Sequence, residues 1–284
     1  MERFILAFAI AWLAINLACT AADRIVGADS DGDKNNNNDQ DNKSGWNPKD
    51  EHPCTVERIS MNDFLKAYGA QGGLPPLFPR PLVITKTAVG ERRNNNKEEE
   101  DPNSSRNSKF QKLTRAASIL DSFPANFTVT LSSSNSFSEH RRTLPFANYL
   151  EDVRTGPALE ADMKSNETWY LFGETYSTEW KHLLESYELP PCQACIDEFD
   201  DSLVALSFGI GNSGSGVQWH VHGPGFSEAI HGRKHWILYS FDNEPRFHPD
   251  QTSLNWMHYD YSAFETLEDR PLECTLHPGD IIYL

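Results

Sequence analysis

Residues 214–240 read GSGVQWHVHGPGFSEAIHGRKHWILYS, and this stretch decides the fold. Val217 to His222, Glu228 to His231 and Lys234 to Ser240 are short β-rich runs that glycine and proline separate. Further on, Pro278-Gly279-Asp280 predicts a tight turn between two more such runs, because proline fixes φ and glycine accepts a positive φ. Short strands divided by turns are typical of a small β-barrel.

Upstream of this stretch, helical and strand-like patterns alternate. A capping-box spacing predicts a helix from Ser60 to Tyr68, apolar spacing predicts a helix over 110–123, and another helix begins at Thr178. The fold class is therefore mainly β with flanking helices (α+β), in which the upstream elements pack on the barrel. The upstream strand-like runs are 82–85, 127–131, 169–172 and 203–208.

Acidic residues outnumber basic ones, with 41 Asp and Glu against 25 Lys and Arg and a net charge of -16. This balance argues against nucleic acid and against an anionic membrane surface as the main partner. An aromatic content of 11% argues against a wholly disordered chain. Two stretches are nevertheless expected to be disordered, the Asn-rich linker 23–50 and an insertion at about 91–108 within the domain 51–284.

The N-terminus has the parts of a secretory signal. Arg3 precedes an apolar run from Phe4 to Ala18, and small residues follow at 19–22. The run is short for a membrane span, which needs about 20 apolar residues, although a membrane anchor stays an alternative. We expect a signal peptide over 1–22, the endoplasmic reticulum lumen as the compartment, and no membrane span after cleavage.

Four cysteines and four N-x-S/T sequons fit this compartment. Four cysteines suit two disulfides and allow three pairings, which the sequence leaves open. Sequons are glycosylation acceptors only in the secretory pathway, so we expect a glycoprotein. The cysteines that remain after cleavage are Cys54, Cys192, Cys195 and Cys274, and the sequons begin at Asn42, Asn103, Asn126 and Asn166.

Cys192-Gln193-Ala194-Cys195 has two interpretations. A C-x-x-C motif in the lumen can be a thiol–disulfide oxidoreductase site. No thioredoxin-like βαβ pattern surrounds it, and no second C-x-x-C completes a zinc site, so a structural disulfide is favoured. Cys54 with Cys274 is then a guess for the second pair, made only because two pairs are needed.

His220 and His222 are the candidate metal ligands. On a strand they project from the same face, since side chains alternate with period two. Neutral imidazole suits Fe, Zn, Cu or Ni. The alternative is a pair of histidines that form hydrogen bonds at the mouth of a barrel.

The run 214–239, with Pro278-Gly279-Asp280 and the strand after it, resembles the cupin-type barrel of the JmjC family of Fe(II)- and 2-oxoglutarate-dependent oxygenases. Further motifs are similar to a luminal branch of this family. The resemblance implies a double-stranded β-helix (jelly roll) whose last strands, with the distal histidine, are missing from a truncated sequence. The similar motifs are 54–58, 128–133, 144–146, 169–173, 222–225 and 270–274.

The resemblance also implies roles for individual residues. His220 stands at the first iron ligand of the family's H-x-D motif, and His222 stands where the family has Asp. Lys234 would bind the distal carboxylate of 2-oxoglutarate and Tyr170 would hydrogen-bond it, the alternatives being a solvated lysine and a core aromatic. Because His222 is neutral, the site loses a charge that helps to hold Fe(II).

Two function classes follow. One is an Fe(II)- and 2-oxoglutarate-dependent protein hydroxylase. The other, which the lost charge and the missing ligand favour, is a luminal regulatory or binding protein with a degraded iron site, a non-catalytic or weakly active pseudoenzyme. Two alternatives stay open for its cofactors, Fe(II) with 2-oxoglutarate or neither of them, and a luminal protein is expected as partner or substrate. A thiol–disulfide role of Cys192 and Cys195 is a third and weaker alternative. A secretory leader and a net charge of -16 both argue against histone demethylation.

Overall fold

The computed structural model describes eleven segments of the chain, and all statements below concern these segments. Several predicted features lie outside them: His222, Cys192, Cys195, three of the four sequons (Asn42, Asn103 and Asn166), the linker 23–50 and most of the insertion 91–108. The described residues are 10–16, 54–68, 80–85, 106–134, 140–155, 168–173, 175–190, 205–220, 225–239, 245–261 and 271–284.

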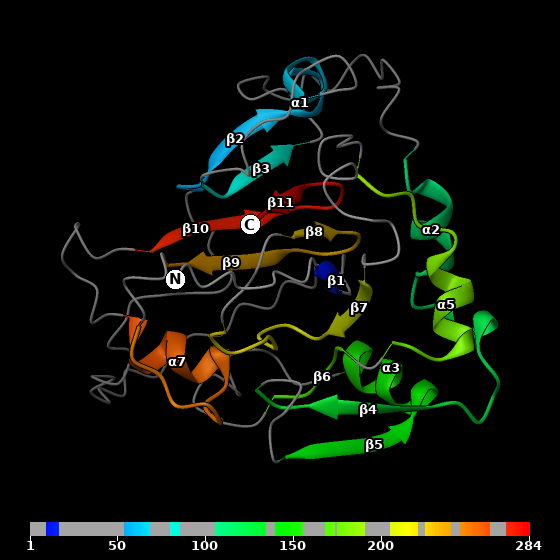
Figure 1. Ribbon diagram of the computed structural model, residues 1–284. Coiled ribbons are helices and arrows are strands. Elements are labelled where there is room, and N and C mark those ends of the chain that lie inside the picture. Colours follow the sequence, from blue (N-terminus) through cyan, green and yellow to red (C-terminus); the bar gives the residue numbers. More distant parts are fainter. Residues whose placement is uncertain are drawn as a thin grey trace, which may run out of the picture.

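The strands form a nine-stranded sheet in the order β2-β3-β11-β8-β1-β7-β6-β4-β5 and a two-stranded sheet of β10 and β9, and Figure 1 shows this succession from β2 at the top to β5 at the bottom. Mixed parallel and antiparallel pairing with short strands agrees with the predicted mainly β class. The bounds are β1 Ile10–Asn16, β2 Glu57–Ser60, β3 Leu82–Thr85, β4 Thr128–Ser132, β5 Arg141–Pro145, β6 Tyr170–Leu171, β7 Ala205–Gly211, β8 Phe226–Ala229, β9 Lys234–Leu238, β10 Leu272–Leu276 and β11 Ile281–Tyr283.

Short helices flank the sheet. Helices α2 and α5 lie side by side along one end of it, and α7 lies beyond β9 (Figure 1). The helical bounds are α1 Met61–Tyr68, α2 Ser108–Leu113, α3 Phe146–Thr155, α5 Thr178–Leu184 and α7 Ser253–Tyr259, with a 3₁₀ turn at Ile119–Ser122. In the described part of the chain, no helix has the length and apolar content to cross a membrane.

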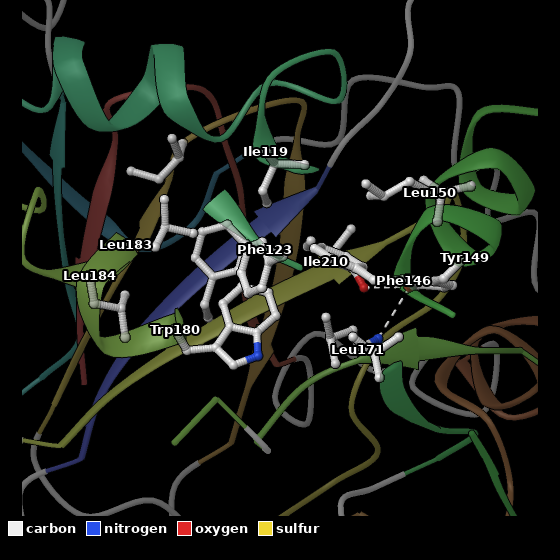
Figure 2. Packing of buried hydrophobic residues seen from close by; sticks show 14 of the residues in the cluster. Ile119, Phe123, Phe146, Tyr149, Leu150, Leu171, Trp180, Leu183, Leu184 and Ile210 are labelled. Atoms are coloured by element: carbon white, nitrogen blue, oxygen red, sulfur yellow. Dashed lines mark hydrogen bonds between the residues drawn. The ribbon is translucent and has the colours of Figure 1, made fainter. Parts of the chain in front are cut away.

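The largest core cluster packs α3 and α5 on the sheet around Trp180, whose side chain is 1% exposed. The Trp180 ring lies 4.5 Å from Phe123 and 5.6 Å from Phe146 between centroids. Figure 2 shows these rings with Tyr149, whose hydroxyl accepts a hydrogen bond from the Leu171 backbone N–H at 3.1 Å. Each such aromatic pair contributes about 0.5–1.5 kcal/mol beyond the area that it buries, so this part of the core is firmly held.

The helix predicted from Ser60 is confirmed as α1. The backbone N–H of Asp63 donates to Ser60 Oγ at 3.1 Å, and Ser60 Oγ donates to the Asp63 carboxylate at 2.6 Å. The single helix predicted over 110–123 is wrong, because α2 ends at Leu113 and Thr114 Oγ donates back to the Phe110 carbonyl at 2.8 Å. Such a bond competes with helix continuation, and the apolar spacing reflects burial of two separate turns.

The strand predicted over 217–222 is also wrong for residues 217–220, which are not in a strand. The backbone N–H of Gln218 donates to the Ser134 carbonyl at 2.7 Å, and Ser253 Oγ donates to the Val217 carbonyl at 2.8 Å. These backbone groups are therefore satisfied by a loop residue and a side chain. The predicted turn at Pro278-Gly279-Asp280 is confirmed, with Gly279 at φ 93°.

The apolar run predicted to be a signal peptide contains β1. This strand pairs in parallel with β7 along Ile10–Asn16 and with β8 along Trp12–Ala14. It joins the part of the sheet from β2 to β8 to the part from β7 to β5. Cleavage of 1–22 stays a prediction, and it would leave facing edges of β7 and β8 without this partner.

The Cys54–Cys274 disulfide is present, so the pair guessed from the sequence is confirmed. It fixes the segment before β2 to β10. The adjacent Thr55 backbone N–H donates to the Glu273 carbonyl at 2.8 Å, which reinforces the junction.

Candidate functional site

His220 lies at the end of a segment whose backbone is bonded to Ser134, in the loop after β4. Its Nδ1 is 2.7 Å from the carbonyl oxygen of Gln218. Because a carbonyl only accepts, Nδ1 carries the proton and Nε2 is the nitrogen with the lone pair. The geometry therefore presets the tautomer in which Nε2 can bind a metal or accept a hydrogen bond.

Lys234 begins β9 and has an unusual environment for an ammonium group. Its Nζ lies 4.2 Å from the ring centroid of Trp236, within the range of a cation–π contact. The residue is half-buried by its accessible surface, and desolvation of the ammonium by the surrounding protein lowers the pKa of Lys234 to about 7. Among the residues that the structure describes, no carboxylate pairs with this ammonium.

His220 and Lys234 belong to one electrostatic environment. His220 is an exposed residue, yet the surrounding protein reduces the hydration of its imidazole, which is the main cause of its lowered pKa. The charge of Lys234 lowers the same pKa further, which requires the two groups to be near each other. The structure thus places Lys234 near enough for its charge to act on His220, whereas Tyr170, the third of these predicted residues in a described segment, bonds to the Ser134 carbonyl.

Tyr170 is buried, and its hydroxyl donates to the Ser134 carbonyl at 3.2 Å, while burial raises its pKa. The same Ser134 carbonyl accepts from Gln218 N–H, so Tyr170, Ser134 and Gln218 form one connected group behind His220. Two buried atoms, Ser134 Oγ in this group and Trp236 Nε1 on β9, have no hydrogen-bond partner in the described part of the chain. Such atoms are expected where water or a ligand completes a site.

Sequence reasoning missed Gln218, Trp236 and Ser134. Alternation was a usable signal for Trp236, because it stands two positions after Lys234 on a strand and so shares its face. Gln218 stands two positions before His220, but its role depends on a loop conformation. No local pattern marks Ser134, because its contacts come from the fold.

His235 on β9 is half-buried and has polar partners on β10. Its Nδ1 lies 2.9 Å from Thr275 Oγ1 and its Nε2 lies 3.1 Å from Glu273 Oε2. Tyr261 OH donates to the other Glu273 oxygen at 2.6 Å. The pairing of β10 with β9 places Glu273 and Thr275 on the face of His235.

Within the described segments, no three His, Cys, Asp or Glu side chains come together as a metal site. A shallow hollow beside α7 does not include His220 or Lys234. It is lined by Arg246, Phe247, His248, Gln251 and Asp260.

Comparison with known proteins gives the family. The cupin-like domain pattern matches residues 78–284. The chain is 36% identical to mouse JmjC domain-containing protein 8 over 237 residues, which covers 82% of this chain and 76% of that protein. It is 34% identical to the human JmjC domain-containing protein 8 over 248 residues, 84% of this chain and 81% of that protein.

A plant protein is more distantly similar. The Arabidopsis thaliana lysine-specific demethylase JMJ21 is 29% identical over 153 residues, 48% of this chain and 14% of that protein. The pattern match spans most of the chain, and His220, Lys234, Tyr170 and strands β3 to β11 lie within it. The chain therefore belongs to the cupin-like family, in its JmjC branch, as the resemblance of its motifs predicts.

Proposed function

We propose that this chain is a JmjC-type cupin protein of the endoplasmic reticulum lumen that binds a small carboxylate at the mouth of its barrel and acts as a regulatory or binding protein with little or no oxygenase activity. The single observation that carries the binding part is the environment of Lys234. The family resemblance supplies 2-oxoglutarate as the first carboxylate to test.

A lysine without a paired carboxylate is costly to bury, because desolvation disfavours its charged form. An anionic ligand beside Nζ supplies the missing counter-charge and restores the full positive charge of the group. The Trp236 ring contacts Nζ but carries no full negative charge, so it does not replace a carboxylate. Lys234 therefore fits one end of a dicarboxylate, in agreement with the role that the resemblance implies.

The residues fit Fe(II) less well than they fit the carboxylate. His220 Nε2 is a suitable donor, but the second donor of the motif, His222, is a neutral imidazole where the family has a carboxylate. A site without this charge holds Fe(II) more weakly. Fe(II), when bound in this family, supplies the oxygen chemistry, so weak binding favours a regulatory role.

A second candidate is an Fe(II)- and 2-oxoglutarate-dependent protein hydroxylase. The observation that favours it is the His220 ring, whose Nδ1 contact with the Gln218 carbonyl leaves Nε2 as the basic nitrogen. The thiol–disulfide alternative rests on Cys192 and Cys195, which lie outside the described residues.

The test uses the full chain produced through a secretory route. Calorimetry measures 2-oxoglutarate binding with and without Fe(II), and succinate formation is followed in parallel. Lys234→Met tests the carboxylate site, and Lys66→Met, an exposed lysine on α1, is the matched control. We expect the wild-type protein to bind 2-oxoglutarate without forming succinate. Lys234→Met should abolish this binding, and Lys66→Met should preserve it.

Other outcomes are equally informative. Stoichiometric Fe(II) that His220→Ala removes, together with succinate formation, would establish the hydroxylase and overturn the regulatory proposal. Folded protein that binds no 2-oxoglutarate or other small dicarboxylate would overturn both the carboxylate-binding proposal and the hydroxylase alternative.

The luminal location is part of the same proposal. It is supported by the composition of the leader, the Cys54–Cys274 disulfide and the sequon at Asn126, which is exposed in a turn before β4. A luminal protein of this kind meets protein partners in the secretory pathway, and its acidic charge favours partners other than nucleic acid.

A further inference from the structure

We propose that Gln218 and helix α7 form a positioning unit that fixes the orientation and tautomer of His220. The inference rests on the proposed function only in taking His220 as the group that meets a metal or ligand. Neither the motif at 217–222 nor the predicted elements indicated α7.

The first line of evidence is that α7 and the residues before it contact three consecutive residues ahead of His220. Ser253 Oγ donates to the Val217 carbonyl at 2.8 Å, and Gln218 Nε2 donates to the Gln251 carbonyl. The Trp256 ring packs edge-on to Trp219 with centroids 4.9 Å apart. Three adjacent attachments leave this backbone little freedom.

Gln218 connects these contacts to the imidazole. Its side chain is buried, with Nε2 on Gln251 and Oε1 accepting from the Trp219 N–H at 2.9 Å. Its backbone N–H donates to Ser134, and its carbonyl oxygen faces His220 Nδ1 at 2.7 Å. Each polar group of Gln218 thus has a defined partner, and rotation of the residue would break several bonds at once.

The α7 side of the unit is itself anchored. Thr252 caps the helix by accepting from the Asn255 N–H at 3.2 Å, and Trp256 Nε1 donates to the Arg246 carbonyl at 3.0 Å. Gln251 Nε2 donates to Asp260 Oδ2 at 2.8 Å. Leu254, Trp256 and Met257 form a buried cluster beneath the helix. The unit therefore holds His220 in one orientation, as the residues around metal-binding histidines do.

A general stabilising role for α7 would leave the tautomer of His220 unchanged, which separates the two explanations. The experiment records the ring ¹⁵N resonances of histidine-labelled full-length protein without metal at constant pH, with the His220 signals assigned by His220→Gln. Wild-type protein is expected to show His220 as the Nδ1–H tautomer. Ser253→Ala and Gln218→Leu are expected to give a mixture of the two tautomers.

Cobalt(II) affinity supplies a second readout. Loss of an orienting partner typically weakens metal binding by about 10- to 100-fold, and we expect this range for both variants. Ser253→Thr keeps a hydroxyl and is expected to restore the wild-type tautomer and affinity. Ser215→Ala is the matched control, because Ser215 Oγ donates to the Asn212 carbonyl at 2.9 Å in the same segment but does not contact α7.

The named outcomes decide between the explanations. An unchanged tautomer in Ser253→Ala and Gln218→Leu would overturn the positioning role, whatever their stability. If the wild type binds no cobalt(II) but the variants change the tautomer, the positioning role holds and the metal role of His220 fails. An equal effect of Ser215→Ala would also overturn the proposal, because the segment would then be sensitive to any lost hydroxyl.

Discussion

Arg106 and Glu228 form a buried ion pair, with Nη2 2.7 Å from Oε2 and side chains that are 12% and 3% exposed. Glu228 lies on β8, and its Oε2 also accepts from Tyr187 OH at 2.6 Å and from Asn107 Nδ2 at 3.2 Å. Burial raises the pKa of Glu228, and Arg106 opposes this rise. The pair thus ties the end of the expected insertion 91–108 to the central sheet.

Removal of one partner leaves the other charge buried and uncompensated. We expect Arg106→Ala to lower the free energy of unfolding by about 3–5 kcal/mol, measured by urea denaturation followed by tryptophan fluorescence. Lys66→Ala is the control, because Lys66 and Asp63 form an exposed pair at 3.2 Å and such pairs contribute little. A similar midpoint for both variants would contradict a structural role of the buried pair.

The lowered pKa of Lys234 predicts a particular pH dependence of stability. The folded pKa is about 7 and the usual value is 10.5, so between these values the unfolded chain binds more protons than the folded protein. Stability therefore rises as the pH increases from 7 to 10.5, and the penalty for burying the charge is fully present below pH 7. Lys234→Met should remove this slope, which denaturation at a series of pH values measures.

The same pKa predicts how a carboxylate ligand binds. Its affinity should fall as the pH rises above 7, because the free ammonium loses its charge. Binding at pH 8 should take up a proton, since the ligand raises the pKa of Lys234. Calorimetry in two buffers of different ionisation enthalpy measures this uptake, and equal apparent enthalpies in both would contradict it.

Asn126 is the sequon at which the structure supports modification. The residue is exposed in a turn in which the Phe127 N–H donates to the Pro124 carbonyl at 2.9 Å, and Thr128 begins β4 with an exposed side chain. If the chain enters the lumen, we expect one glycan here, which glycosidase treatment and a gel shift detect. Thr128→Val should remove it and Thr128→Ser should keep it. A chain without a glycan at Asn126 in secretory cells would contradict the luminal location.

The sequence predicted several strands and the capped helix because their signals are local. Ser60 and Asp63 stand at capping-box spacing, and the run 82–85 is apolar at its first three positions and buried at all four, as a strand buried on both faces requires. The family of the chain was also predictable, since its motifs are short and in order. The role of Gln218 was not predictable, because its partners Ser134 and Gln251 come from distant parts of the chain. Arg106 was missed for the same reason, since its polar neighbourhood in the sequence resembles a disordered insertion and only tertiary burial fixes it.

The Cys54–Cys274 disulfide closes a loop with a sequence separation of 220 residues, so it restricts the unfolded chain strongly. We expect the paired substitution Cys54→Ser with Cys274→Ser to lower the free energy of unfolding by about 2–5 kcal/mol. The backbone hydrogen bond from Thr55 to Glu273 at the same junction should persist, so we expect the variant to unfold in a cooperative transition. Peptide mapping of the non-reduced protein checks the pairing, and a peptide that joins Cys54 to Cys192 or Cys195 would contradict it.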